Sequence, residues 1–460
     1  NISIFDLFEI NAKKTQVEWF NLNDTQRLEN CKKIVELLVE LEQQIVQSMN
    51  SEELKLYKQI EVPLANVLFK VETAGITLDI TQFKVLEGEL ATQLKQLEDI
   101  IYQECGNVFN INSSKQLQEV LFEKLKLPTV GIKKNTNGYS TDEDSLNILD
   151  TQGIQIAKYL LSYRTLNKLQ TTYITKLPLL IDHQNKLHTT FDQALVLSGR
   201  LSSRDPNLQN IPIRNEWGQR IRKCFIADKD HVLVCADYSQ IELRILAHIS
   251  GDENLIAAFN NNADIHSITA GEIFNKPINM VTHDERRYAK IINFSLLYGK
   301  TVFGLAQELK IDRITAKNYI DAYFAKYQKV KSCLEEIKQY AHEHEFVQTV
   351  FGRKIYLPEI NSNNRILRDA TERVALNAPM QGTSADIIKL AMCRIDNYLV
   401  QEKLSTKIIL QIHDELILQV PVSEIAIIEN ILPSLMTSNM PLSVNLTVNL
   451  KTANNWGDAH

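Results

Sequence analysis

The chain has 460 residues, which is enough for two to four domains and a large buried core. Its 44% hydrophobic and 23% charged residues are typical of a globular protein in water, and no apolar run approaches a membrane span of about 18 residues. Because the net charge is −6, the field of the whole molecule would repel a polyanion, so a polyanionic partner must meet local basic patches.

The cysteines favour an intracellular protein. They are scattered and form no C-x-x-C pair, which argues against both a zinc site and a disulfide framework. No secretory leader is evident, and the first residue is Asn1, so we expect a fragment or a processed form.

Helical spacing of apolar residues dominates the first hundred residues. It predicts helices over Leu28–Met49 and Ile80–Gln103, with a further helical run that begins at Pro63. Gly75 and the following segment Thr77–Asp79 predict a turn. The leucines of the second long helix have the spacing of ordinary helix packing.

Two segments are basic in an otherwise acidic chain. Residues 158–176 carry four basic side chains and no acidic one, and residues 200–223 carry six against two acids. Such local excess would suit a phosphate backbone, although a solvated surface explains either segment equally well. Between them, the side chains of Asn207, Gln209 and Asn210 could read base edges or merely cap turns.

A short apolar strand beginning at His231 ends in Asp237, and a helix is expected from Ile241. A carboxylate at this place could be a metal ligand, a catalytic base or simply a helix cap. The following residues, 250–365, are predicted to be mostly helical.

Within them, Thr282–Gly299 begins like a capping box and ends in the glycine typical of a helix C-terminus. One face offers two cations and then two aromatic rings, namely Arg286, Lys290, Phe294 and Tyr298. The opposite face would hold the helix to the protein through Ala289, Ile292 and Leu296. Cations suit a polyphosphate and rings suit a base, so the stripe indicates a nucleotide, with a solvated face as the alternative reading.

Two further patterns complete the chain. Arg373, Asn377 and Gln381 share one helical face, and Pro379 with Gly382 predicts a break before a new helix from Thr383. The apolar arms of Lys407–Val420 predict a β-hairpin with the polar triplet His413–Glu415 at its tip.

Taken together, these segments resemble the family A DNA polymerases of the bacterial DNA polymerase I type, from about Pro63 to His460. The resemblance rests on five motifs in the family's order, which are G-R-L-S-S-R-D-P-N-L-Q-N-I-P (199–212), D-Y-S-Q-I-E-L-R (237–244), R-R-x-x-K-x-x-x-F-x-x-x-Y-G (286–299), N-A-P-M-Q-G-T (377–383) and H-D-E (413–415).

The resemblance implies an α+β, right-hand polymerase with a thumb, an antiparallel palm sheet and helical fingers. The implied domains are an inactive remnant of a 3′–5′ exonuclease domain (1–54), the thumb with the first palm segments (55–198), palm (199–240), fingers (241–365) and palm again (366–460). Because the exonuclease signature Tyr-x-x-x-Asp is absent around Arg27–Lys33, we expect no proofreading.

By the same resemblance, Asp237 and Asp414 would seat two Mg²⁺ ions, with Mn²⁺ as a possible substitute and the Tyr238 carbonyl as a further ligand. Glu415 would support them, and Lys290 would assist catalysis. Two carboxylates about 4 Å apart repel by roughly 4 kcal/mol at an effective dielectric constant of 20, so a metal would reverse an otherwise costly pairing.

The resemblance also implies roles in substrate binding. The residues expected to bind the deoxynucleoside triphosphate are Arg286, Lys290, His266, Phe294, Tyr298, Gln240 and Glu242, the last as a steric gate against a 2′-hydroxyl. The residues expected to bind primer–template DNA are Arg200, Asn207, Gln209, Arg373, Asn377, Gln381, His413, Arg164 and Lys168. Minor-groove contacts among them would test pair shape without reading sequence.

The expected activity is magnesium-dependent addition of deoxynucleotides to a primer, which would fill gaps in DNA repair or replication. We expect a bacterial monomer in the cytoplasm, associated with the nucleoid, and an organellar location is the alternative. A single-subunit RNA polymerase is the alternative enzyme, which Glu242 argues against. A catalytically silent nucleic-acid clamp is the other alternative, and it would have no use for Asp237, Asp414 and Lys290. Two departures from the family pattern, Val196 for a threonine and Ser295 for a glycine, bear on primer contact and fidelity.

Overall fold

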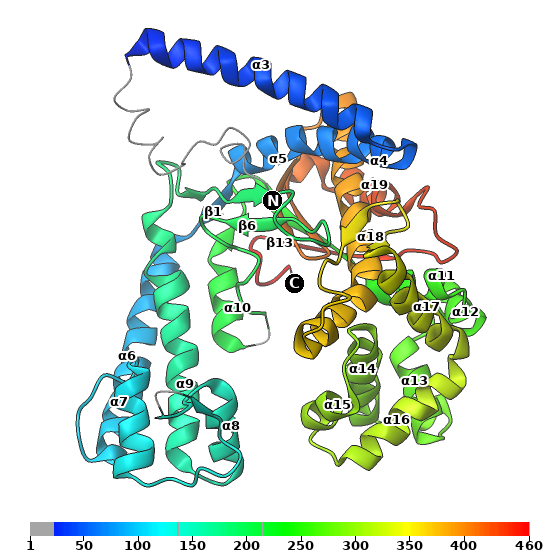
Figure 1. Cartoon of the computed structure of the whole chain (residues 1–460). Helices are drawn as coiled ribbons and strands as arrows, with labels where there is room; N and C mark the ends of the chain where they lie inside the picture. The colour runs from blue at the N-terminus through cyan, green and yellow to red at the C-terminus, as the bar shows by residue number, and fades with distance from the viewer. Residues whose placement is uncertain (1–22, 136–137, 214, 460) are drawn as a thin grey trace. The chain divides into compact units, whose positions relative to one another are not determined.

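The structure is a computed structural model that describes residues 23–135, 138–213 and 215–459 (Figure 1). The chain forms two compact units. Unit 1 combines the residues up to Ala74 with Thr190–Gln209 and Val234–Thr452, and unit 2 comprises Gly75–Thr189, Asn210–Leu233 and the residues from Ala453 onward. Among the described residues, no helix is both long and apolar enough to cross a membrane.

Unit 1 begins with a helical segment. It consists of α3 (Asp24–Ser48), α4 (Ser51–Leu56), the π-helical turn η1 (Tyr57–Glu61) and α5 (Val62–Ala74). Asn23 and Gln26 form a capping box at the start of α3, which buries none of its residues. The helix expected over 28–49 is therefore confirmed, whereas the first 22 residues of the expected exonuclease remnant lie outside the described residues.

Unit 2 is built on long helices and a three-stranded sheet. The helix expected from Ile80 is confirmed as α6 (Ile80–Cys105), which Asp79 caps. The turn expected at Thr77–Asp79 is wrong, because β1 (Ile76–Leu78) pairs with β4 (Lys186–Leu187) and β7 (Phe225–Ile226), both distant in sequence. The other described helices are α7 (Ser114–Gln118), η2 (Glu119–Lys124), α8 (Glu143–Thr151), α9 (Gln155–Leu169), η3 (Gln170–Ile174), η4 (Leu177–Leu179) and α10 (Glu216–Lys223). The short strands β2 (Lys134–Asn135) and β3 (Gly138–Tyr139) pair antiparallel.

The central sheet of unit 1 has the strand order β11–β12–β8–β13. The expected hairpin is confirmed as β11 (Lys407–Ile412) and β12 (Glu415–Pro421), and the expected strand as β8 (His231–Tyr238). β13 (Val448–Ala453) completes the sheet, and η6 (Val422–Glu424) and α19 (Ile425–Thr437) follow β12. The interior residues of β11 and β12 are buried, so the sheet lies in the core of the unit.

Helices predominate from Ile241 to His344 and so fill most of the predicted helical range 250–365, whereas residues 345–364 form a hairpin and turns. The helices are α11 (Ile241–Ser250), α12 (Glu253–Asn260), α13 (Ile265–Phe274), η5 (Ile278–Met280), α14 (His283–Leu297), α15 (Val302–Leu309), α16 (Arg313–Lys326) and α17 (Gln328–His344). Two hairpins complete the unit, one of β5 (Thr190–Asp192) with β6 (Ser202–Arg204) and one of β9 (Phe346–Gln348) with β10 (Lys354–Tyr356). Helices together with antiparallel sheets confirm the expected α+β class.

α18 (Arg365–Gln401) corrects one expectation. It is a single helix with Pro379 inside it, so the break predicted before Thr383 does not occur. Proline removes one backbone hydrogen bond, but the helix is buried from Ala378 through Lys389 apart from Gln381, and that packing holds it together. Gly382 serves close packing here, since a Cβ on it would lie 2.6 Å from Thr349 Cγ2.

Candidate active site

The two predicted metal-binding acids come from neighbouring strands of the central sheet. Asp237 precedes Tyr238 at the end of β8, and Asp414 lies in the turn between β11 and β12. The amide of Tyr238 donates a hydrogen bond of 3.2 Å to the carbonyl oxygen of Asp414, so the backbones of the two acidic motifs meet at this point. His413, before Asp414, has a φ of 52°, the left-handed conformation that shapes this turn.

The end of β8 is fixed from several sides. The buried Tyr238 side chain donates 2.6 Å to the carbonyl of Met436 in α19, and the amide of Ser239 donates to the carbonyl of Thr447. Gln240, at φ 53°, then turns the chain into α11. This geometry holds the main chain around Tyr238, whose carbonyl is the predicted further metal ligand, in one place.

Glu242 is the centre of a hydrogen-bond network between three motifs. Its side chain is buried in the first turn of α11. Arg200 donates to Oε1 over 2.6 Å, and the hydroxyl of Tyr298 donates to Oε2 over 2.8 Å. Arg200 and Tyr298, predicted to contact primer and template base, thus both hold the predicted steric gate.

The pKa values of Glu242 and Asp414 are both raised in this site. Burial raises the pKa of Glu242, although Arg200 and Tyr298 oppose the shift, and the charge of Asp414 raises it further. Burial likewise raises the pKa of Asp414, with Arg200 opposing and Glu415 adding to the shift. A positive charge here would stabilise the ionised carboxylates.

The oxygen atoms near the end of β8 suit a magnesium ion, which needs few protein ligands, better than a metal ion whose ligands all come from the protein. Within residues 23–135, 138–213 and 215–459, no three His, Cys, Asp or Glu side chains are grouped to hold an ion. Mg²⁺ prefers oxygen ligands and keeps waters and substrate phosphates in its shell, so a pair of carboxylates with a backbone carbonyl is an adequate protein contribution. Asp237, Asp414 and the Tyr238 carbonyl provide these oxygen types.

The cationic–aromatic stripe predicted on Thr282–Gly299 lies on α14. Thr282 and Glu285 form the expected capping box, and the expected packing face is buried at Ala289, Ile292 and Leu296. Lys290 is exposed and makes no hydrogen bond or ion pair with a described residue. Phe294 stacks on Tyr298, with ring centroids 6.4 Å apart.

Arg286, by contrast, is already paired. Its Nε donates 2.6 Å to Oδ2 of Asp264 and its Nη2 donates 3.3 Å to Oδ1. Burial opposes ionisation of Asp264, but the hydrogen bonds from Arg286 and Ser267 lower its pKa to about 2. An anionic ligand of Arg286 would therefore compete with a carboxylate that sequence reasoning did not single out.

His266 lies beside this stripe and is 1% exposed. Asn293 Nδ2 lies 3.0 Å from His266 Nδ1, and because an amide NH₂ only donates, the neutral ring carries its proton on Nε2. Nε2 is buried without a hydrogen-bond partner among the described residues. Burial lowers the pKa of His266 to about 4, and Lys290 and Arg286 act in the same direction. The site thus presents an unused neutral donor near two cations.

Seven of the residues predicted to contact DNA lie in unit 1, where they divide between two places. Arg200, Gln209 and His413 line one small cavity. The side chain of Gln209 also donates a hydrogen bond of 2.9 Å to Gln411 Oε1, and the side chain of Asn207 accepts one from the backbone amide of Gln209. Both side chains therefore stabilise local structure. In this cavity His413 is exposed and Arg200 is partly buried.

The second place is one face of α18. Arg373 is exposed, and Gln381 is partly buried. Oδ1 of Asn377 is buried and has no hydrogen-bond partner within the described part of the chain. A buried polar atom without a hydrogen-bond partner lowers the stability of the fold. A donor from a ligand on this face would remove that cost.

Arg164 and Lys168 belong to unit 2. Arg164 is partly buried, and its guanidinium donates to the carbonyl and hydroxyl oxygens of Thr141. Lys168 is exposed on α9. Arg164 therefore has a local structural role, and its predicted contact with DNA stays a prediction.

Sequence reasoning missed the residues that support the stripe. Asp264 caps α13, and the only signal for it is that it stands two residues before His266. Ser295, noted as a departure from the family, donates 3.0 Å to Glu308 Oε2, which Lys300 also contacts over 2.7 Å. This contact ties α14 to α15, and the sequence gives no local sign of it.

Comparisons with known proteins identify the family of this chain. The model of DNA polymerase family A matches residues 80–458. The chain is 44% identical to DNA polymerase I of Bacillus subtilis over 91% of this chain and 48% of that protein. It is also 44% identical to DNA polymerase I of Pseudomonas aeruginosa over 88% of this chain and 44% of that protein. The chain thus spans about half the length of the curated relatives it matches.

Among solved structures, the chain is similar to the POL domain of Pol1 from M. smegmatis, solved in complex with DNA primer-template and dNTP. The TM-score is 0.84 at 40% identity, over 88% of this chain and 72% of that one. This likeness confirms the expected right-hand polymerase fold. With a family match that covers most of its length, a shared fold and the acidic motifs joined at one point, the chain belongs to DNA polymerase family A.

Proposed function

We propose that this chain catalyses DNA-templated DNA synthesis, adding deoxynucleotides to a primer 3′-hydroxyl with release of pyrophosphate. The observation that carries the proposal is the hydrogen bond between the Tyr238 amide and the Asp414 carbonyl, which joins the two acidic motifs. Glu242, Arg200 and Tyr298 connect this point to the stripe of α14. Two bound magnesium ions would supply charge stabilisation at the attacking and leaving oxygens.

The triphosphate would lie along the cationic half of the stripe. Lys290 is exposed and forms no ion pair with any residue that the structure describes, so within that part of the chain a phosphate could bind it without displacing another group. The unused Nε2–H of His266 would donate to a phosphate oxygen, which would give this buried donor a partner. Arg286 would join them after exchanging Asp264 for a phosphate.

The nucleoside would lie along the aromatic half. Phe294 offers a ring face to the sugar and base, and Tyr298 would border the template-base pocket. Glu242 is held on both oxygens, which suits a rigid side chain that leaves no space for a 2′-hydroxyl. On the DNA side, Arg200, His413 and the α18 face would contact the primer terminus and the minor groove.

Extension of a labelled primer on a DNA template with Mg²⁺ tests the proposal. We expect extension by the wild-type chain and a loss of about 100-fold or more in kcat/KM for Lys290→Met, because a charged phosphate contact is lost. Lys317→Met is the matched control, since Lys317 is exposed on α16 and also makes no hydrogen bond or ion pair with a described residue. Absence of extension by the folded wild-type chain would refute the proposal.

The same assay separates the alternatives. Efficient extension with ribonucleotides would indicate an RNA polymerase, and DNA binding without extension would indicate a clamp. The bacterial relatives support a bacterial enzyme, and we place its activity in the cytoplasm at the nucleoid, as a monomer that fills gaps in DNA repair and replication.

A further inference from the structure

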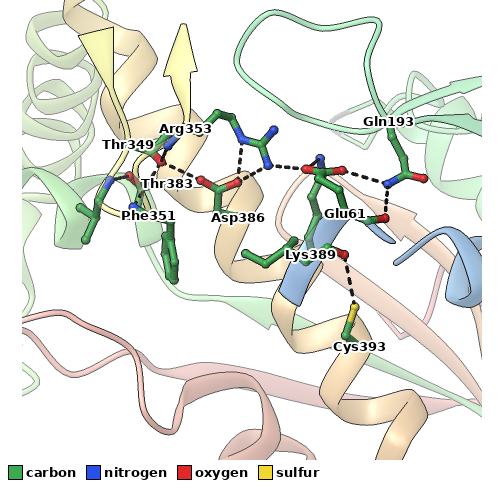
Figure 2. Close-up of polar contacts among 11 residues, drawn as sticks. Glu61, Gln193, Thr349, Phe351, Arg353, Thr383, Asp386, Lys389 and Cys393 are labelled. Atoms are coloured by element: carbon green, nitrogen blue, oxygen red, sulfur yellow. Dashed lines mark hydrogen bonds and ion pairs between the residues drawn. The ribbon is translucent and has the colours of Figure 1, made fainter. Parts of the chain in front are cut away.

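The loop between β5 and β6, residues 193–201, carries Arg200 and lies on a group of buried charges. We name this group the buried charge cluster; its members are Glu61, Arg353, Asp386 and Lys389 (Figure 2). Glu61 ends η1, Arg353 precedes β10, and Asp386 and Lys389 lie on α18. None of these residues belongs to the motifs on which the proposed function rests.

The cluster is closely bonded. Arg353 Nε donates 2.8 Å to Oδ1 of Asp386, and Arg353 Nη2 donates to Glu61 Oε1. Lys389 Nζ donates 2.8 Å to the same Glu61 oxygen. Thr349 donates 2.8 Å to the second oxygen of Asp386, so both oxygens of this fully buried carboxylate are satisfied.

Stability alone is a weak reason for such a cluster. The side chains of Asp386 and Lys389 are 0% exposed and those of Arg353 and Glu61 are 16% and 18% exposed. Removing two acids and two bases from water is costly, and well-packed apolar residues often stabilise a core at least as well. A buried ionic group with directional bonds is better suited to fixing a geometry.

Both ends of the Arg200 loop contact the cluster. Gln193, at the first end, donates 2.9 Å to Oε2 and 3.1 Å to the carbonyl oxygen of Glu61. Gly199, at the other end, has a φ of +80°, and a Cβ on it would lie 2.7 Å from Arg353 Nε. The carbonyl oxygen of Ser198 lies close to α18, 3.0 Å from where a Cβ of Gly382 would be. The backbone before Arg200 is therefore confined between Arg353 and α18.

We propose that Arg353 is a positioning residue that, held by Asp386 and Glu61, fixes Gly199 so that Arg200 reaches Glu242 and the small cavity that it lines with His413. The inference rests on the proposed function and assigns it a supporting group that touches neither substrate nor metal. Arg200 is the next residue after Gly199, and its guanidinium bonds Glu242 over 2.6 Å. A displaced Gly199 backbone therefore changes where that guanidinium lies.

A double-mutant cycle in primer extension tests this dependence. Arg353→Met removes the charge and the bonds while keeping much of the side-chain volume. We expect it to lower kcat by about tenfold. We also expect it to change the ratio of ribonucleotide to deoxynucleotide incorporation in the same direction as Arg200→Ala. In an Arg200→Ala background, Arg353→Met should change neither quantity further, because the side chain through which it acts is gone.

The control variant is Val347→Ala. Val347 is buried in the same β9–β10 hairpin as Arg353 and packs in an apolar group with Ile355 and Ala378, so its truncation destabilises the hairpin without removing a charge. Thermal melting in the absence of substrate shows whether each variant is folded at the assay temperature. Val347→Ala should keep the wild-type incorporation ratio.

Gly199→Ala provides a second route if Arg353→Met does not fold. It leaves every charge of the cluster in place but adds a Cβ against Arg353 Nε and strains the positive φ. We expect the same loss of kcat and the same dependence on Arg200. The inference would be overturned if the loss of kcat caused by Arg353→Met or Gly199→Ala multiplied with the loss caused by Arg200→Ala in the double variant. It would also be overturned if Arg353→Met or Gly199→Ala alone left kcat unchanged. An inactive but folded wild-type chain would instead refute the proposed function.

Discussion

The hydroxyl of Tyr298 donates a 2.8 Å hydrogen bond to Oε2 of Glu242, so the last aromatic ring of the stripe and the predicted steric gate form one unit. Arg200 holds the other oxygen of Glu242. Sugar selection should therefore depend on the donors that orient the gate as well as on the gate itself. Glu242→Ala should admit ribonucleotides more readily, and unchanged sugar selectivity would refute the gate assignment.

Tyr298→Phe isolates the orienting hydrogen bond. A bond to a charged group contributes about 1.5–3 kcal/mol, so we expect discrimination against ribonucleotides to fall by about tenfold while the ring stays in place. Single-nucleotide incorporation with matched deoxy- and ribonucleotides measures this. Tyr356→Phe is the control, because Tyr356 is 61% exposed on β10. Equal discrimination against ribonucleotides by the wild type, Tyr298→Phe and Tyr356→Phe would mean that the Tyr298 hydroxyl has no part in sugar selection.

Asp264→Asn should strengthen nucleotide binding. The carboxylate of Asp264 occupies Arg286, and asparagine keeps the N-cap of α13 while removing the competing charge. Because a partly exposed ion pair is worth about 0–1 kcal/mol, the fall in KM for deoxynucleotides should be at most about fivefold. Steady-state kinetics at fixed primer–template measures it. A higher KM would show that Asp264 positions Arg286 for the substrate.

His266 predicts a specific pH dependence of stability. Burial lowers its pKa to about 4, against an unfolded value of 6.5, with Asp264 opposing the shift and Lys290 and Arg286 reinforcing it. Between these values the unfolded chain binds the extra proton, so stability falls as the pH falls from 6.5 to 4. At pH 5 the loss from this one group is about 2 kcal/mol.

Urea unfolding of wild type and His266→Gln at pH 7 and pH 5 checks this. The variant should lose less free energy of unfolding between the two pH values than the wild type does. The comparison removes the contribution of other titrating groups, which both proteins share. Equal losses would show that His266 titrates alike in the folded and unfolded states.

The sequence predicted the parts of the site that are encoded locally. The α14 helix follows from a capping box, a repeat of four residues and a terminal glycine, all within one segment. The end of β8 and the β11–β12 turn follow from short apolar strands next to acids. Their meeting through Tyr238 and Asp414 came from the family resemblance, because no local pattern encodes which strands become neighbours.

What could not be predicted depends on contacts between distant residues. Pro379 and Gly382 look like a helix break, but burial of α18 and close packing of Gly382 against Thr349 outweigh the local preference. β1 has three residues and exists only through partners far along the chain. The Arg286–Asp264 pair and the buried charge cluster likewise join charges that are well separated in sequence.

The most direct test of the whole account is primer extension by Asp414→Asn across a Mg²⁺ titration. Asp321→Asn is the control, because Asp321 is exposed on α16 and makes no hydrogen bond or ion pair with a described residue. We predict that Asp414→Asn remains folded but loses activity by about 100-fold or more at every Mg²⁺ concentration, whereas the control matches wild type. Equal activity and equal Mg²⁺ dependence in Asp414→Asn and wild type would contradict the account.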